Sequence, residues 1–145
     1  MKWRDLTENE AATLPEARLG GGLLCAVIVA AVLCLVALAG YTMAFRQFLA
    51  IGPFYVVAIT FVTLLAFAFV VMTLLRFRHT PLVMSVGLVA WIVYRMAVAL
   101  YNGAVTLWPL QIDGLGEGIL AAGFCAYLAS GVRPNAYYRR RLPVP

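Results

Sequence analysis

The stretch LGGGLLCAVIVAAVLCLVALAGYTMAF, from Leu19 to Phe45, decides which class of protein this chain belongs to. It carries no charged residue over 27 positions, whereas a helix needs about 20 apolar residues to cross about 30 Å of hydrocarbon. The Ala-Leu-Ala at 37–39 resembles a signal-peptide cleavage site, but the segment before the run holds more acids than bases, and the run continues past that site. We therefore interpret 19–45 as a transmembrane helix.

The composition of the whole chain agrees with this interpretation. Hydrophobic residues make up 64% of the 145 residues and charged residues 12%, while a soluble domain carries roughly 25% charged residues. Too few polar side chains are present to cover a folded core in water. The composition therefore predicts an integral membrane protein without a separate soluble domain.

Three further apolar runs follow the first, at 53–75, 81–101 and 114–130. The last is the least apolar and is about as short as a crossing can be. The sequence thus predicts an all-α protein, an integral membrane four-helix bundle. We expect a polar N-terminal segment over 1–18, the transmembrane domain over 19–131 and a basic tail over 132–145.

The polar N-terminal segment contains its own helix signal. Thr7 and Glu10 have the spacing of a capping box, which predicts a short surface helix that Pro15 would end.

Lys and Arg are distributed unevenly around the four predicted helices. Three precede the first helix, two follow the second and four lie in the tail, against one after the first helix and none after the third. Because basic residues stay on the cytoplasmic side, nine against one predicts both termini in the cytoplasm. The arginines expected to anchor this topology or to contact lipid headgroups are Arg76, Arg78, Arg133, Arg139, Arg140 and Arg141.

The tail, GVRPNAYYRRRLPVP from Gly131 to Pro145, allows several interpretations. Its arginines can bind anionic lipid headgroups, each contributing about 1 kcal/mol near a negative surface, with Tyr137 and Tyr138 in the membrane interface beside them. One short basic stretch is too small for a nucleic-acid surface, so no nucleic acid is expected as a partner. We favour topological anchoring with lipid contact, and a docking site for a cytoplasmic partner is the third possibility.

Small residues recur at every fourth position in the first and last predicted helices. Helices in lipid gain little from mutual hydrophobicity, so small residues that let backbones approach are what allow them to pack. We expect the two small-residue faces to touch, within one chain or across a dimer. They consist of Gly22, Ala26 and Ala30 in the first helix and Gly114, Gly118, Ala122, Ala126 and Ser130 in the last.

Two ionisable residues lie within the predicted crossings. At about 1.5 Å rise per residue, Arg95 and Glu117 both come within about 10 Å of the outer surface and can pair across neighbouring helices, with Asp113 as a competing partner. Intramembrane charges are candidates for a ligand or ion site, but we favour a structural pair, or side chains that snorkel to water. Tyr94, Tyr101 and Trp108 near the same end suit an aromatic belt, or a ligand pocket.

The sequence contains no pattern typical of catalysis. HExxH, GxSxG and a glycine-rich phosphate loop are all missing, and a single His cannot supply paired haem ligands. Cys25, Cys34 and Cys125 lie in apolar runs without CxxC spacing, so we expect buried small hydrophobes rather than a metal site or disulfide. The sequence predicts no enzyme activity, no metal and no cofactor.

The glycine-rich LGGGLL, the four runs, the basic connection after the second run and the ending YLASGVRPNAYYRRR resemble a family of small bacterial inner-membrane proteins. That family is catalogued as a domain of unknown function. Its members typically begin with Gly-Gly-Trp-Leu, where this chain has Gly-Gly-Leu. They end with a tyrosine, a serine, a basic-Val-basic motif and an aromatic residue, and in this chain Gly131 and Pro134 interrupt the basic-Val-basic motif. The resemblance implies four helices and a bacterial inner membrane, and brings no activity. The residues in comparable places are Tyr127, Ser130, Val132, Arg133 and Tyr137 or Tyr138.

These features predict a small non-enzymatic accessory or scaffolding subunit that binds a larger membrane protein or copies of itself. The alternative is a small oligomeric transporter or channel in which Arg95 and Glu117 line an anion or proton path. The strong charge bias argues against the dual topology of some small exporters.

Overall fold

The computed structural model describes residues 3–101 and 108–143, without the side chains of 44, 48, 51 and 108–115. The described chain is mostly helical, so the all-α prediction is confirmed apart from two strands of three residues each. The elements are β1 (Trp3–Asp5), α1 (Glu8–Thr13), the 3-10 helix η1 (Pro15–Ala17), α2 (Gly21–Ile51), α3 (Pro53–Leu74), α4 (Thr80–Tyr101), α5 (Trp108–Ser130), α6 (Val132–Arg139) and β2 (Arg141–Pro143).

Three helices are long and apolar enough to cross a membrane, at 15–43, 53–74 and 80–101. Large apolar side chains cover their outer faces, far more than a soluble protein exposes on neighbouring helices. The transmembrane prediction is confirmed for these three. In the described part of the chain α5 is not among them, so its crossing stays a prediction. The exposed side chains include Ile28, Val32, Leu35, Val57, Leu64, Phe67, Val86, Val89 and Val93.

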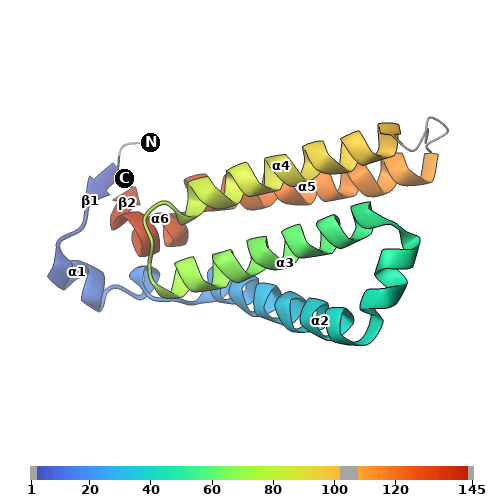
Figure 1. Cartoon of the computed structure of the whole chain (residues 1–145). Coiled ribbons are helices and arrows are strands. Elements are labelled where there is room, and N and C mark those ends of the chain that lie inside the picture. Colours follow the sequence, from blue (N-terminus) through green and yellow to red (C-terminus); the bar gives the residue numbers. More distant parts are fainter. Residues whose placement is uncertain (1–2, 102–107, 144–145) are drawn as a thin grey trace.

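The first long helix extends further than the sequence predicts. We expected it to end at Phe45 before a connection over 46–52, but α2 continues to Ile51 and only Gly52 separates it from α3. Gly52 has a φ of +143°, which glycine adopts without strain, and Pro53 stands in the first turn of α3 as expected. The last turns of α2 bend across the end of the bundle toward α3 (Figure 1).

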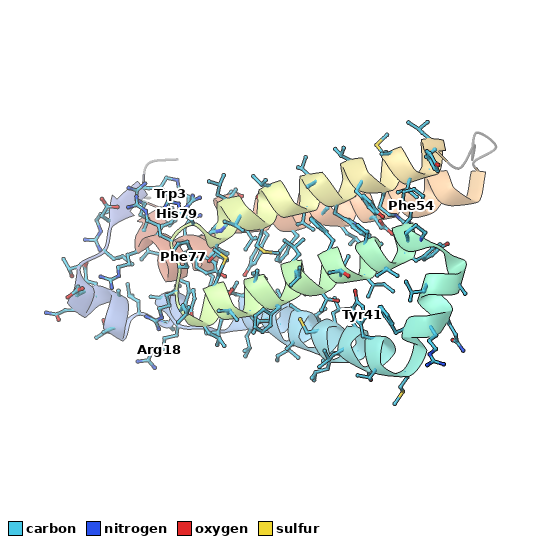
Figure 2. All side chains as sticks on the ribbon, viewed as in Figure 1. Trp3, Arg18, Tyr41, Phe54, Phe77 and His79 are labelled. Carbon is cyan, nitrogen blue, oxygen red and sulfur yellow. The ribbon has the colours of Figure 1, made fainter. Side chains whose placement is uncertain are left out.

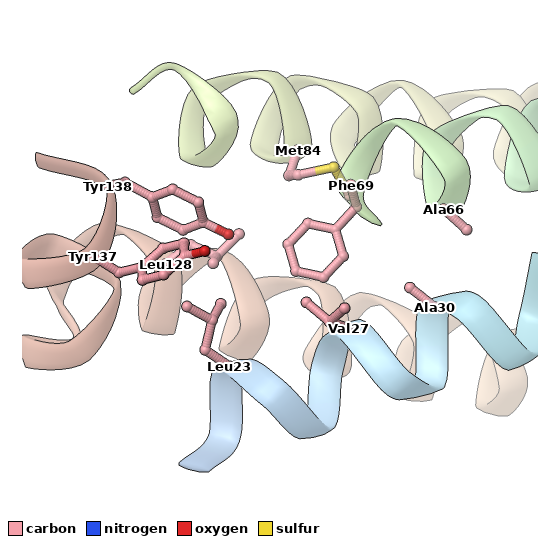
Figure 3. Packing of buried hydrophobic residues seen from close by; sticks show 9 residues of the cluster. All are labelled: Leu23, Val27, Ala30, Ala66, Phe69, Met84, Leu128, Tyr137 and Tyr138. Atoms are coloured by element: carbon pink, nitrogen blue, oxygen red, sulfur yellow. The ribbon is translucent and has the colours of Figure 1, made fainter. Parts of the chain in front are cut away.

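The long helices run alternately in opposite directions, with α3 packed between α2 and α4, and α5 packed on α4 (Figure 1). Within the apolar region the Tyr41 hydroxyl joins α2 to α3 by hydrogen bonds to Thr60 and to the carbonyl of Val56 (Figure 2). The largest buried cluster lies at the end of the bundle where α6 sits (Figure 3). It comprises Leu23, Val27, Ala30, Ala66, Phe69, Met84, Leu128, Tyr137 and Tyr138.

Both ends of the described chain meet at that same end of the bundle. β1 pairs antiparallel with β2, with Trp3 opposite Pro143 (Figure 1). Leu6, Ala17 and Ala136 form a second buried cluster beneath this ribbon. The described parts of the polar N-terminal segment and the basic tail, residues 3–18 and 132–143, therefore combine into one structure, which we call the cap.

The short surface helix predicted in the N-terminal segment is present as α1. The Thr7 side chain accepts a hydrogen bond from the Glu10 amide, and the Glu10 carboxylate accepts one from the Thr7 amide. This backbone hydrogen bond holds the pKa of Glu10 below its usual value. The helix ends at Thr13, and Pro15 begins η1.

A tight turn at Gly131 lets α6 fold back from α5 onto the bundle. A Cβ at position 131 would lie 2.4 Å from the Tyr127 carbonyl oxygen and 3.0 Å from Cδ of Pro134. The buried Asn135 side chain fastens the turn, because its amide donates to the carbonyls of Ala129 and Gly131 at 2.9 Å each. Only glycine fits this approach without a backbone shift.

Gly131→Ala should therefore lower the free energy of unfolding by about 1–3 kcal/mol, the usual effect of forcing extra atoms into a packed site. Gly116→Ala is the matched control, because a Cβ there meets nothing within 4 Å and alanine favours a helix by up to about 1 kcal/mol. Thermal unfolding in detergent measures both variants. Equal melting temperatures for the two would show that the turn tolerates a Cβ.

Candidate functional site

The predicted intramembrane charge pair forms in the structure. Nη2 of Arg95 on α4 lies 3.1 Å from Oε1 of Glu117 on α5, and the two side chains are 40% and 37% exposed. The Arg95 guanidinium also lies 5.8 Å from the ring centre of Trp91, one turn earlier on α4. The structure thus brings the two side chains together as an ion pair. Asp113, the competing partner, belongs to α5, but its side chain lies outside the described residues.

Glu117 has one carboxylate oxygen in the pair and one without a partner. Its Oε2 is buried and accepts no hydrogen bond from any residue that the structure describes. A buried polar atom left unpaired is costly, and more so when it carries charge. This oxygen is therefore the atom of the pair that is open to a proton or to another donor.

Aromatic side chains connect α3 and α4 beside the pair. The rings of Phe61 and Trp91 stack at 6.2 Å between centres, and those of Trp91 and Tyr94 at 6.0 Å. The Tyr94 hydroxyl donates to the carbonyl of Phe54 at 2.7 Å, so Tyr94 ties two helices together. Tyr101 is exposed, as a belt residue should be. The third aromatic predicted for the belt, Trp108, has a side chain outside the described residues.

The small-residue faces of the first and last long helices do not pack on each other within the chain. Ala30 of α2 is buried in the main cluster beside Ala66 of α3, Ala26 packs against that cluster, and a Cβ at Gly22 would meet the Tyr127 hydroxyl at 3.3 Å. The single-chain form of that prediction is wrong, because α5 turns its aromatic side inward.

The small-residue face of α5 points out of the bundle instead. Ala122, Ala126 and Ser130 are exposed, and a Cβ at Gly118 would meet nothing within 4 Å. We call these four residues the α5 outer face. Gly114 has the same spacing but lies in the part of α5 whose side chains are not described.

The tail arginines hold the cap together. Nη1 of Arg140 lies 2.9 Å from Oε1 of Glu8, and Nε of Arg141 lies 2.7 Å from Oδ1 of Asp5. Arg140 and Arg141 are therefore less available to bind lipid headgroups, because both already have acidic partners. Arg133 and Arg139 also have partners within the chain: Arg133 donates to the carbonyl of Pro15 at 3.4 Å, and Arg139 donates to the side chain of Asn135 at 3.2 Å.

Tyr137 and Tyr138 are buried, 6% and 4% exposed, so their predicted place in the membrane interface is wrong. The Tyr137 hydroxyl donates to the carbonyl of Thr73 at 2.9 Å, and the Tyr138 hydroxyl bonds the Thr73 side chain at 2.7 Å. Thr73 stands in the last turn of α3, where its carbonyl accepts from the Arg76 amide and has a second lone pair for the Tyr137 hydroxyl. A threonine at the end of an apolar helix is the signal that could have identified this contact.

The cysteines differ from the prediction in their burial. Cys25 is exposed, while Cys34 and Cys125 are half-buried, and all three are free thiols. Cys34 donates to the carbonyl of Thr63 at 3.7 Å. Among the described residues, no group of three His, Cys, Asp or Glu side chains gathers in one place.

No family model matches the chain, and no curated protein or solved structure does either. The resemblance to small inner-membrane proteins therefore stays a prediction, and a function has to be argued from the geometry.

Tyr138 should make the cap sensitive to alkali. Burial raises the pKa of Tyr138 to about 12 from its ordinary value of 10.0. The folded state thus keeps a proton that the unfolded state loses, so stability is complete below pH 10 and falls as the pH rises toward 12. At pH 11 the loss should be about 1.4 kcal/mol relative to pH 8.

Tyr138→Phe should remove this alkaline loss while lowering stability at pH 8 by about 1 kcal/mol, the net contribution of one hydrogen bond. Unfolding free energies of both proteins at pH 8 and pH 11 give the comparison. A stability difference that stays constant between the two pH values would exclude Tyr138 as the titrating group.

Proposed function

We propose that this chain is a small non-enzymatic membrane protein that acts as an accessory or scaffolding subunit, docking through the α5 outer face to a helix of a membrane partner or of a second copy. The observation that supports it most directly is the contrast between helices. Exposed large apolar side chains are numerous on α2 and α4, whereas the described part of α5 has two, Ile119 and Leu120.

A face of small residues is suited to a protein neighbour more than to lipid. Glycine and alanine let a second backbone approach closely, and close packing is the main source of helix association in a bilayer. The Ser130 hydroxyl donates to the carbonyl of Ala126 in its own helix at 2.7 Å. The face is therefore free of unsatisfied hydroxyl donors that would oppose an apolar neighbour.

In this proposal α5 is the fourth crossing, and the cap faces the cytoplasm of a bacterial inner membrane. Three features support it. α5 runs beside α4 over its length (Figure 1), both chain ends lie at the cap, and nine of the eleven Lys and Arg belong to the segments on that side.

Enlarging the α5 outer face tests the docking role. Ala122→Leu and Ala126→Leu should each weaken the complex at least about tenfold, because a leucine holds the partner backbone away. Ala90→Leu is the matched control, since Ala90 is exposed on α4. Native mass spectrometry after mild detergent extraction measures the complex. A wild-type chain without a partner or second copy, or complexes unaffected by both α5 variants, would refute the proposal.

A second candidate, an oligomeric transporter or channel, is favoured by the unpartnered Oε2 of Glu117. A carboxylate with one oxygen, Oε1, paired with Arg95 and the other, Oε2, without a partner resembles a proton or ion site in an apolar setting. Under the accessory proposal the same pair serves only to fasten α4 to α5.

Arg95→Gln and Glu117→Gln separate these two functions. We expect each variant to lower stability by about 1 kcal/mol, and the exchanged double variant Arg95→Glu with Glu117→Arg to recover most of it. Proton and chloride flux in proteoliposomes, measured alongside assembly, completes the test. Flux in the wild type that disappears in Glu117→Gln while assembly persists would favour the transporter over the accessory role.

A further inference from the structure

The loop from Leu75 to His79, between α3 and α4, alternates apolar and basic side chains, and every one of them is exposed. Leu75 is 73% and Phe77 49% exposed. The loop follows directly on the apolar span that ends at Leu74, so it stands at the level where a bilayer changes from acyl chains to headgroups.

The two arginines of this loop keep their charge uncompensated. Among the described ion pairs of the cap, Asp5, Glu8 and Glu10 bind Arg141, Arg140 and Arg4. Neither Arg76 nor Arg78 forms an ion pair with a residue that the structure describes. The acidic residues of the N-terminal segment therefore pair with two of the four tail arginines, Arg140 and Arg141, and with neither arginine of the loop.

Arg76 also has a backbone conformation that disfavours an arginine. Its φ is +52°, at the position after a helix end where glycine is usual. The Phe77 amide donates to the carbonyl of Met72 at 2.8 Å and the Arg76 amide to that of Thr73 at 3.0 Å, the two bonds of a Schellman motif. A residue with a Cβ is strained there, and strain retained in a fold points to a role for the side chain.

Packing against the cap orients this side chain. The Arg76 guanidinium lies 4.9 Å from the ring centre of Tyr137, which is itself fixed by its bond to Thr73. His79 packs edge-on against Phe77 at 5.6 Å, and both lie at the capped end (Figure 2). The side chains of this loop therefore have defined positions, and the Arg76 cation is held in one orientation by the Tyr137 ring.

We propose that this loop, and not the tail, is the site where the protein binds anionic phospholipid headgroups. Arg76 and Arg78 contact the phosphate, while Leu75 and Phe77 enter the acyl boundary beside it. A bilayer surface offers negative charge and apolar volume side by side. An acidic protein segment would match the arginines but would leave the exposed leucine and phenylalanine in water.

The experiment measures how many phosphatidylglycerol molecules the full chain retains from nanodiscs of phosphatidylglycerol and phosphatidylcholine. Arg76→Gly and Arg78→Gln should each lower the affinity for phosphatidylglycerol about fivefold. Arg76→Gly relieves the backbone strain, so the fold is expected to survive, and Arg78→Gln changes an exposed side chain. Inorganic phosphate added in excess should not displace the lipid.

The matched control is Arg140→Gly, because Arg140 also has a positive φ, of 51°, and the same charge is removed. It should keep phosphatidylglycerol affinity within about twofold of the wild type. An equal loss in Arg140→Gly, or no loss in Arg76→Gly and Arg78→Gln, would overturn the proposal. Lipid retention unchanged in the loop variants together with loss of a bound acidic protein would overturn it in favour of a protein ligand.

Discussion

The two hydrogen bonds from Tyr137 and Tyr138 to Thr73 join α6 to the end of α3, and α6 is the element through which the cap packs on the bundle. They connect residues 64 and 65 positions apart and lie in a buried site, where an unpaired hydroxyl or carbonyl is costly. They hold α6 beneath the bundle, α6 carries β2, and β2 pairs with β1. Composition predicts only that this last segment is basic.

Hydropathy and spacing predict the parts of this fold that rest on local rules. An apolar run needs a nonpolar environment wherever it lies, so the three confirmed spans were visible in the sequence, and the capping box of α1 needs only Thr7 and Glu10. Arg95 and Glu117 were predictable as a pair because depth follows from residue count when neighbouring helices are antiparallel. The cap was not predictable, because its ion pair between Arg140 and Glu8 joins positions 132 apart. The short local sequence of α6 contains no pattern that specifies so distant a partner.

Residue spacing also predicts how closely helices can approach without specifying which helices meet. The small residues of α2 and α5 were expected to pack together, yet Ala30 packs beside Ala66 and Gly22 approaches Tyr127. The inner side of α5 is filled by Phe124, which meets Phe69 edge-on at 5.6 Å. Large rings on that side leave Ala122, Ala126 and Ser130 exposed on the outside of α5.

Two arginines at the capped end, Arg76 and Arg140, differ in whether they have an acidic partner. Arg76 and Arg140 share an unfavourable backbone conformation, with φ values of 52° and 51°, but only Arg140 reaches an acid, Glu8. For Arg140 the backbone strain is offset by its ion pair with Glu8, which joins the tail to the N-terminal segment. Among the residues that the structure describes, Arg76 has no acidic partner and its cation lies over the Tyr137 ring. A glycine would make the same backbone hydrogen bonds with less strain. An arginine in that position is therefore explained by something outside the chain, and the nearest negative charge available to a loop at the end of an apolar helix is the headgroup layer.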